Sequence, residues 1–344
     1  MRILSIETSC DETSIAVVEA TGGIRAPKFR VLRNIVSSQI AVHIPFGGVV
    51  PNLAKREHIR NLPKVLKQLT NFNKKLVDEI DAIAVTVGPG LEPALWTGIE
   101  FAKDLSKKWK KPLFGANHME GHLFSNWLTK SEKRHATSRK VAIKFPAVAL
   151  VVSGGHTILL HMQSMTKWKK LGETRDDAAG EAFDKVARML GLPYPGGPQI
   201  SKIAKKGDCR AINFPQPMKH APNYDFSFSG VKTSVLYYLR DNPKANNADV
   251  AASFEAAVTD VLTYKTERAA REFDARSILL SGGVAANQQL RKKLLVISRK
   301  LSVNFFAPDM EYNTDNAAMI AAAAYVRHLE KKKYKMQAAS NLTL

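Results

Sequence analysis

The sequence is poor in cysteine and in long apolar segments. Only two of its 344 residues are cysteines, Cys10 and Cys209, which excludes a disulfide framework and a cysteine-rich zinc module. A reducing compartment, the cytoplasm, is the expected location. No apolar run approaches the roughly 20 residues that span a bilayer, and the chain opens on a strand-like segment, so we expect neither a membrane anchor nor a signal peptide.

Acidic residues are scarce relative to basic ones. The chain has 51 Lys and Arg against 31 Asp and Glu, a formal net charge of +20. Such an excess attracts polyanions. The basic residues gather in four segments, at 103–111, 129–144, 291–300 and 328–335. Because phosphate contacts add up along one surface, this clustering favours a nucleic-acid partner over a uniformly basic composition.

The standard nucleotide-binding motifs are also absent. No G-x-x-x-x-G-K-[ST] occurs, since residues 228–234, FSGVKTS, lack both the adjacent Gly-Lys pair and the upstream glycine. Gly-Gly turns nevertheless follow expected buried strands at 152–157 and 280–287. Glycines there let backbone N–H groups approach phosphate oxygens. A nucleotide site would have to be of another kind, held between two lobes.

What the sequence does contain is a duplicated α/β plan. Residues 2–20 and 147–163 each predict a strand, a short turn and a second strand. Residues 81–105 and 277–294 each predict a buried strand that runs through a glycine turn into a helix. The order of the elements repeats as well as their type, which favours a true duplication over a coincidence between common α/β patterns.

The duplication predicts an α/β fold with two lobes of similar design. The basic, Ser- and Thr-containing stretch 129–145 has the composition of a loop and marks the expected boundary. We therefore expect lobes at 1–145 and 146–344, with the last helix able to pack back on the first lobe.

His118 and His122 stand four residues apart in an expected helix, so their rings share one face and can reach one metal ion. Metalloproteases use H-E-x-x-H instead. Here Glu120 follows His118 by two positions and points about 200° around the helix from it. This position removes the general base that a protease needs. The spacing alone leaves open a different metal site or two histidines without a metal.

Acidic side chains mark three further places. Asp11 and Glu12 lie at the tip of the first expected hairpin, Asp184 lies on an acidic central helix, and Asp315 begins the last helix. Each is open to a structural interpretation as a helix cap or a solvated turn residue. This holds most of all for Asp315, because Thr-Asp before an apolar run is typical of an N-cap.

Together these motifs resemble the TsaD family, the tRNA N(6)-adenosine threonylcarbamoyltransferases, in its bacterial form. The resemblance extends from residue 1 to about residue 330. The motifs that carry it occur in the family's order and read IETSCDET, NHMEGH, VSGGHT, DDAAGEAFDKVARMLGLPYPGGP, SGGVAAN and NTDNAAMIA. The resemblance implies two actin-like, ribonuclease-H-like lobes, the ATPase fold of the ASKHA superfamily, with an active-site cleft between the lobes.

The resemblance also implies roles for individual residues. One divalent metal ion, Fe²⁺ with Zn²⁺ as the alternative, is expected on His118, His122 and Asp315. Two histidines and a carboxylate leave coordination positions open for a substrate. Substrate contacts are expected at Val151, Val152, Ser153, Gly154, Gly155, Asp184, Gly197 and Asn287. For proton handling, the candidates are Asp11 and Glu12.

The implied reaction transfers a threonylcarbamoyl group from threonylcarbamoyl-adenylate to the exocyclic amine of the adenosine 3′ to the anticodon, with release of AMP. The expected substrates are tRNAs that read codons starting with adenine. The amine is a poor nucleophile, so a Lewis-acid metal would help by polarising the acyl carbonyl. The basic surface would hold the tRNA by its phosphates. The family also implies two accessory proteins, TsaB and TsaE.

The sequence departs from the family in two places. One is Asn52, where the family usually has a glutamate, and the other is the basic stretch 129–145, which is longer than the family requires; residues 90–98, GLEPALWTG, differ more mildly from the family motif and keep its glycines. Three other functions compete with the transferase. A small-molecule kinase or ATPase of the same superfamily would have no use for the histidine pair, a metalloprotease lacks its base, and an RNA-binding scaffold would not need an intact site.

Overall fold

The structure is a computed structural model that describes residues 1–72, 75–130 and 142–344. Most of the basic stretch 129–145, for which the sequence predicted a loop, lies outside the described residues. Within the described part of the chain, no helix combines the length and the hydropathy that a bilayer-spanning segment needs.

The chain divides into two compact units. The first comprises Met1–Lys140 together with Pro308–Leu344, and the second comprises Val141–Ala307. The lobes expected from the sequence, 1–145 and 146–344, differ from these units mainly at the C-terminus. There the whole of Pro308–Leu344, and not the last helix alone, belongs to the first unit.

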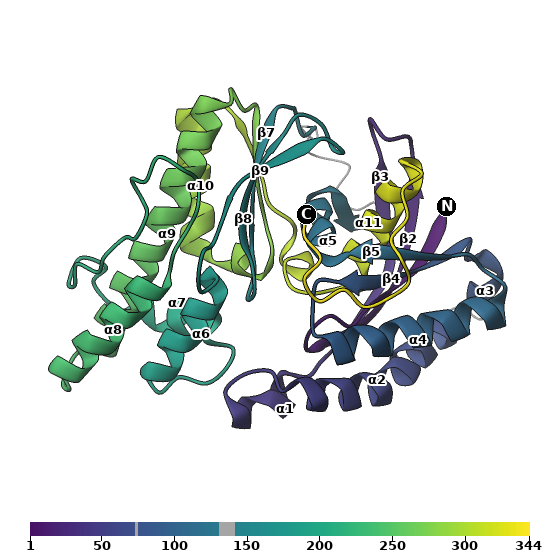
Figure 1. Cartoon of the computed structure of the whole chain (residues 1–344), viewed down its shortest axis with the longest axis horizontal. Coiled ribbons are helices and arrows are strands. Elements are labelled where there is room, and N and C mark those ends of the chain that lie inside the picture. Colours follow the sequence, from purple (N-terminus) through teal and green to yellow (C-terminus); the bar gives the residue numbers. More distant parts are fainter. Residues whose placement is uncertain (73–74, 131–141) are drawn as a thin grey trace. The chain divides into compact units, whose positions relative to one another are not determined.

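The first unit contains a six-stranded sheet in the order β5-β4-β1-β2-β3-β6 (Figure 1). Its strands are β1 (Arg2–Glu7), β2 (Glu12–Thr21), β3 (Lys28–Ser38), β4 (Ala82–Gly88), β5 (Leu113–Asn117) and β6 (Leu128–Lys130). The first three strands form an antiparallel meander, whereas β4 and β5 run parallel to β1. β4 is buried along its whole length, as its apolar sequence AIAVTVG predicts for a strand covered on both faces.

Helices cover both faces of this sheet. They are α1 (Ile40–His43), η1 (Ile44–Phe46), α2 (Pro51–Phe72), α3 (Leu76–Glu79), α4 (Glu92–Trp109), α5 (His118–Phe124), η2 (Ser125–Trp127), η4 (Met310–Tyr312) and α11 (Ala317–Leu329). On one face, Leu4 and Ile6 of β1 pack with Leu62 of α2 and Ile99 of α4. On the other, Ser5 of β1 contacts the start of α11. Because successive side chains of β1 point to opposite faces of the sheet, they contact helices of different layers.

The second unit contains a five-stranded sheet in the order β11-β10-β7-β8-β9. Its strands are β7 (Ala147–Val152), β8 (Thr157–Met162), β9 (Trp168–Glu173), β10 (Ser277–Ser281) and β11 (Asn304–Phe306). Its helices are α6 (Ala179–Met189), α7 (Gly196–Ala204), α8 (Ser229–Asp241), α9 (Asn247–Glu272), η3 (Gly283–Ala286) and α10 (Gln288–Lys300). Again a three-stranded antiparallel meander is extended on one side by two parallel strands.

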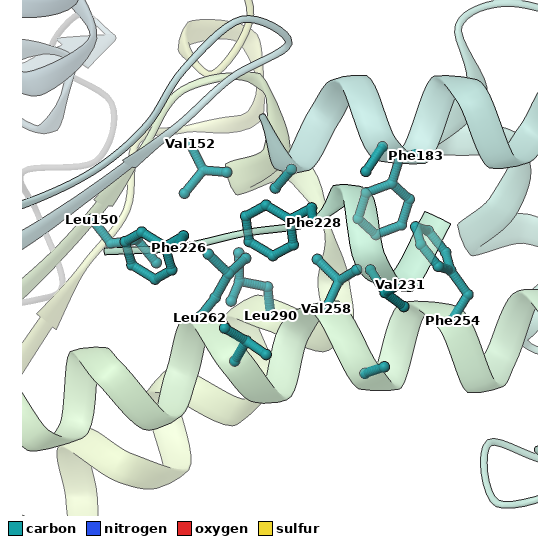
Figure 2. Close-up of a cluster of buried hydrophobic side chains, with 14 of the residues drawn as sticks. Leu150, Val152, Phe183, Phe226, Phe228, Val231, Phe254, Val258, Leu262 and Leu290 are labelled. Carbon is teal, nitrogen blue, oxygen red and sulfur yellow. The ribbon is translucent and has the colours of Figure 1, made fainter. Parts of the chain in front are cut away.

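The core of the second unit joins its sheet to the long helix α9. Figure 2 shows Val152 of β7, Phe183 of α6 and Leu290 of α10 gathered around the α9 side chains Phe254 and Val258, and all five are buried. The rings of Phe183 and Phe254 meet edge to face, with centroids 5.1 Å apart, a geometry that the ring quadrupoles favour. This core holds the ends of β7 and β10 in place.

Both units therefore repeat one strand plan, β3-β2-β1-β4-β5 in the first and β9-β8-β7-β10-β11 in the second. The predicted α/β fold with two lobes of similar design is confirmed. In each unit the carboxyl ends of two neighbouring parallel strands, β1 with β4 and β7 with β10, lie next to each other. Such paired carboxyl ends are where open α/β sheets place their ligands.

A buried lysine in the second unit gives a testable prediction on stability. Lys265 of α9 is buried, and its Nζ donates to the carbonyl oxygen of Asn223 at 3.0 Å. Burial, aided by the positive Arg268, lowers the pKa of Lys265 from 10.5 to about 8. The unfolded chain therefore binds more protons than the folded protein between these two pH values, so raising the pH through this window stabilises the wild type.

We expect the free energy of unfolding of the wild type, relative to Lys265→Met, to rise by about 2 kcal/mol between about pH 7 and pH 9.5. Urea denaturation at both pH values measures this difference. The matched control is Lys205→Met, which removes an exposed lysine of the same unit and should show no such change. A difference that stays constant with pH for Lys265→Met would contradict the prediction.

Candidate functional site

The two histidines sit on α5, a short helix that begins where β5 ends. Asn117, the last residue of β5, caps it, because its side chain accepts hydrogen bonds from the backbone N–H groups of Met119 and Glu120 at 2.8 and 3.3 Å. His118 and His122 are both buried, and their ring centroids lie 4.6 Å apart. The cap therefore fixes the direction in which two adjacent imidazoles leave the sheet.

Asp315 reaches these rings from a distant part of the sequence. Its Oδ1 lies 3.4 Å from Nε2 of His118 and 3.2 Å from Nε2 of His122. The sequence also allowed Asp315 to be the N-cap of the last helix, but this interpretation is wrong. The cap of α11 is Asn316, whose side chain accepts from the N–H of Met319 at 3.1 Å. Asp315 stands just outside the helix.

The start of α11 is clamped to the sheet, which explains how Asp315 is placed. Ser5 of β1 donates its hydroxyl to the carbonyl oxygen of Ala317 at 2.5 Å, and Ala317 donates its N–H to the hydroxyl of Ser14 on β2 at 3.0 Å. Gly121 of α5 permits α11 to come close, since a Cβ there would lie 3.0 Å from the side chain of Met319. Two strands and one glycine thus bring Asp315 to the histidines.

The donor atoms of His118, His122 and Asp315 all lie within 4.8 Å of one another, as a shared metal ion requires. Although His122 Nε2 is close to Asp315, the contact lacks hydrogen-bond geometry. Both ring nitrogens of His122 are buried and have no hydrogen-bond partner among the residues that the structure describes. A buried polar atom without a partner is costly, and an ion bound between His122 and Asp315 would account for Nε2, the nitrogen that faces Asp315. These residues therefore fit a divalent metal.

Glu7 lies directly behind His118 and was missed by the sequence analysis. It is the last residue of β1, it is fully buried, and its Oε2 lies 3.0 Å from Nδ1 of His118. The sequence carried a signal for it, since Glu7 ends an otherwise apolar buried strand, where an acidic residue is rare unless it has a partner.

Two carboxylates, those of Glu7 and Asp315, dominate the electrostatics of the site. Burial by itself lowers the pKa of His118, but Asp315 and Glu7 outweigh burial and raise this pKa well above its usual value. For His122, burial, aided by the neighbouring His118, outweighs Asp315 and Glu7 and lowers the pKa. Burial raises the pKa of Asp315, but the neighbouring histidines more than reverse this and hold it far below its usual value. The carboxylate of Asp315 is thus ionised, as the binding of a cation requires.

Glu120 has a structural role away from the histidine pair. It is fully buried, its Oε2 accepts from Nε of Arg327 on α11 at 2.9 Å, and its Oε1 accepts from the hydroxyl of Tyr334 at 2.7 Å and from the second guanidinium nitrogen of Arg327. Arg327 also pairs with Glu330 at 2.7 Å. The sequence predicted that Glu120 points away from the histidines, and these partners occupy the side chain. It is no general base for this site.

The candidates for proton handling lie at the tip of the β1–β2 hairpin, in the same unit. Asp11 is buried, and its carbonyl oxygen accepts from the N–H of Gln39 at 2.9 Å. Burial, together with the negative Asp11 and Asp315, raises the pKa of Glu12 well above its usual value. Glu12 therefore exchanges a proton at a higher pH than an exposed glutamate does, as an acid–base group acting near neutrality must.

The expected substrate residues all lie in the second unit. Val151 and Val152 end β7, and the turn to β8 is closed by a hydrogen bond from the N–H of Ser153 to the carbonyl oxygen of His156 at 2.8 Å. Alongside, β10 ends at Ser281 and is followed by Gly282, whose φ is +89° and where a Cβ would lie 2.3 Å from the carbonyl oxygen of Val152. A glycine is required there, so the two strand ends can meet.

Three expected substrate residues are glycines with open space beside them. A Cβ added at Gly154, Gly155 or Gly197 would meet nothing within 4 Å. Their lack of a side chain is therefore not explained by packing. Packing thus leaves space for a ligand beside the backbone of the turn at Gly154 and Gly155 and of the start of α7 at Gly197.

The other two expected substrate residues already have local partners. Asp184 of α6 accepts from the N–H of Gly196 at 2.7 Å and so fixes the start of α7. Asn287 caps α10 by accepting from the N–H of Leu290, and its amide donates to Glu255 of α9 at 2.7 Å. Glu255 is buried beside Asn287 and was not among the residues singled out from the sequence.

Comparison with known proteins finds relatives along the whole chain. A family model described as TsaD, tRNA N6-adenosine threonylcarbamoyltransferase, matches residues 30–322. A protein of that name from Thermosipho melanesiensis is 49% identical, with 100% of both chains covered. Another, from Thermosipho africanus, is 48% identical, with 100% of this chain and 98% of the relative covered.

Solved structures share the fold at much lower identity. The activator of the 2-hydroxyisocaproyl-CoA dehydratase from Clostridium difficile superposes with a TM-score of 0.52 at 12% identity, covering 97% of this chain and 99% of its own. HypF from T. kodakarensis gives a TM-score of 0.59 at 13% identity, covering 96% of this chain and 48% of its own. These likenesses concern the fold alone, and they confirm the predicted ASKHA-type fold.

The contacts of Glu120 lead to a prediction that separates structure from chemistry. Glu120→Gln leaves Arg327 without its buried charge partner, and we expect the free energy of unfolding to fall by about 2 kcal/mol. Metal binding should be unchanged, because Glu120 does not face the histidines. Urea denaturation and Zn²⁺ titration measure the two effects. Loss of metal from a folded Glu120→Gln variant, or peptide cleavage that this substitution abolishes, would contradict the assignment.

Proposed function

The chain belongs to the tRNA N6-adenosine threonylcarbamoyltransferase family, and we propose that a divalent metal ion on His118, His122 and Asp315 serves its reaction. The enzyme modifies adenosine in tRNA by attaching a threonylcarbamoyl group to N6. One observation supports the metal most strongly. Two donor side chains of α5 and one from a segment far away in the sequence converge at one place, and Nε2 of the buried His122 has no hydrogen bond to any described residue.

The donor is threonylcarbamoyl-adenylate in this proposal, and AMP leaves as the bond to N6 forms. Fe²⁺ is the proposed ion, with Zn²⁺ as the alternative, and two histidines with one carboxylate suit either. When bound, the ion supplies Lewis-acid chemistry at a carbonyl oxygen and positions open to substrate. The protein's own contribution is to hold the three donors together, two on α5 and one just before α11.

We assign proton handling to the hairpin tip. The amine loses a proton as it attacks the acyl carbon, and Asp11 and Glu12 are the groups proposed to accept it or to orient the amine. The raised pKa of Glu12 supports this role, because a carboxylate that is hard to ionise is a stronger base once ionised. Of the two residues, Glu12 is therefore the better candidate.

Binding of the adenylate is assigned to the second unit. The proposed contacts are the end of β7 with its turn, at Val151, Val152, Ser153, Gly154 and Gly155, and the three further positions Asp184, Gly197 and Asn287. The accessible glycine turns support contacts to phosphate through backbone N–H groups. Because Asp184 and Asn287 are held by neighbouring residues, their proposed role is to shape the site as well as to touch the ligand.

The macromolecular substrate is tRNA, and we extend this to tRNAs that read codons starting with adenine, modified 3′ to the anticodon. The net charge of +20 supports phosphate binding. TsaB and TsaE are the proposed accessory proteins, and the cytoplasm is the proposed location. A small-molecule kinase or ATPase would leave the buried histidine pair without a use, and a metalloprotease would lack Glu120 as its base.

The test uses purified protein with TsaB, TsaE, threonylcarbamoyl-adenylate and unmodified tRNA, and detects the modified nucleoside by mass spectrometry. We expect His122→Ala to reduce product formation by at least about 100-fold, since it removes one of three metal donors. Its far-UV circular dichroism should match the wild type. The control His220→Ala changes an exposed histidine of the second unit and should retain activity. Full turnover by folded His122→Ala would exclude the metal from the reaction.

A further inference from the structure

We propose that Glu7 is a positioning residue for the metal centre: its carboxylate fixes the tautomer and the direction of His118, so that Nε2 is free to bind the ion. The inference rests on the metal site proposed above. It adds a fourth residue to that site, one that acts through His118 and does not itself bind the metal.

The His118 ring has a carboxylate on each of its two sides. Nδ1 lies 3.0 Å from Oε2 of Glu7, and Nε2 lies 3.4 Å from Oδ1 of Asp315. An ionised carboxylate can only accept a hydrogen bond, and the Ser9 hydroxyl, 3.2 Å from Nδ1, can accept one as well, so a proton on Nδ1 satisfies Glu7 and suits both neighbours. The lone pair of a neutral ring is then on Nε2, the nitrogen that faces Asp315 and His122.

Glu7 is itself held rigidly. The hydroxyl of Thr86 on β4 donates to its Oε2 at 2.6 Å, and the N–H of Ser9 donates to its Oε1 at 2.5 Å. Its backbone belongs to β1, which pairs with β2 on one side and with β4 on the other. Both carboxylate oxygens are thus engaged in a fully buried place, and the side chain cannot turn away from His118. A support fixed in this way holds a ligand within a narrow range of directions.

The two histidines differ in this respect. His118 has a carboxylate behind it, whereas neither nitrogen of His122 has a hydrogen-bond partner in the described part of the chain. Glu7 should therefore act on one ligand only. A carboxylate that hydrogen-bonds the far nitrogen of a metal-binding histidine raises the basicity of that ligand, and its loss usually weakens metal affinity by 10- to 100-fold.

The test measures metal affinity directly, with Zn²⁺ titrated into the metal-free protein and Co²⁺ used as a spectroscopic probe. Glu7→Gln keeps the size of the side chain, but its amide can donate as well as accept, so the tautomer of His118 is no longer imposed. We expect Zn²⁺ to bind about 10- to 100-fold more weakly and the visible spectrum of bound Co²⁺ to change. Glu120→Gln, which alters another buried carboxylate of the same unit, should leave both unchanged.

A double-variant comparison distinguishes positioning from a general loss of structure. If Glu7 acts through His118, then adding Glu7→Gln to His118→Ala should cost almost no further Zn²⁺ affinity. Where Glu7→Gln proves unstable, Thr86→Val removes one support of the carboxylate and should weaken Zn²⁺ binding by about threefold.

Three different outcomes would contradict the metal site or the role of Glu7. A wild-type protein that binds no divalent metal would overturn the metal site itself. Wild-type Zn²⁺ affinity and an unchanged Co²⁺ spectrum in folded Glu7→Gln would overturn the role of Glu7 while leaving the metal site standing. Equal losses of affinity from Glu7→Gln with and without His118 would show that Glu7 supports the fold and not the ligand.

Discussion

The structure of the candidate metal centre depends on the packing of α11 against the sheet of the first unit. The clamp of Ala317 between Ser5 and Ser14 uses one hydrogen bond from each of two neighbouring strands, so both the depth and the direction of the helix start are fixed. Asp315 lies two residues before this clamp. A carboxylate attached to a mobile turn would cost more to bury beside two imidazoles than one held by the sheet.

In the same unit, the short helix α5 carries the candidate metal donors on one side and a structural residue on the other. His118 and His122 face Asp315, while Glu120 joins Arg327 and Tyr334. The C-terminal segment reinforces this arrangement, because the carbonyl oxygen of Thr343 accepts from the side chain of Asn117, the residue that caps α5. The helix α5, which carries the candidate metal donors, is therefore held in three ways. Asn117 caps its start, α11 packs beside it, and the end of the chain holds Asn117.

The second unit repeats the strand plan of the first, but glycines mark its paired strand ends. Gly282 is required by its close contact with Val152 of β7, whereas Gly154, in the turn after β7, has open space beside it. Gly282 lets the two strand ends meet, and our proposal places ligand contacts at the open turn. In this proposal, one copy of the duplicated fold provides side-chain donors and the other provides backbone donors.

The sequence by itself determined the α/β duplication, the shared face of the two histidines and the direction of Glu120 away from them, because these follow from periods of 2 and 3.6 residues and from local turn chemistry. The sequence did not determine which residues these side chains contact. Thr-Asp before an apolar run suggests a cap at Asp315, yet Asn316 caps the helix and Asp315 faces the histidines. For the contact of Glu7 with His118, the sequence contained only a weak signal, an acidic residue in an apolar strand. Only the tertiary structure decided these contacts, since they join residues brought together by sheet order and helix packing, which no local pattern encodes.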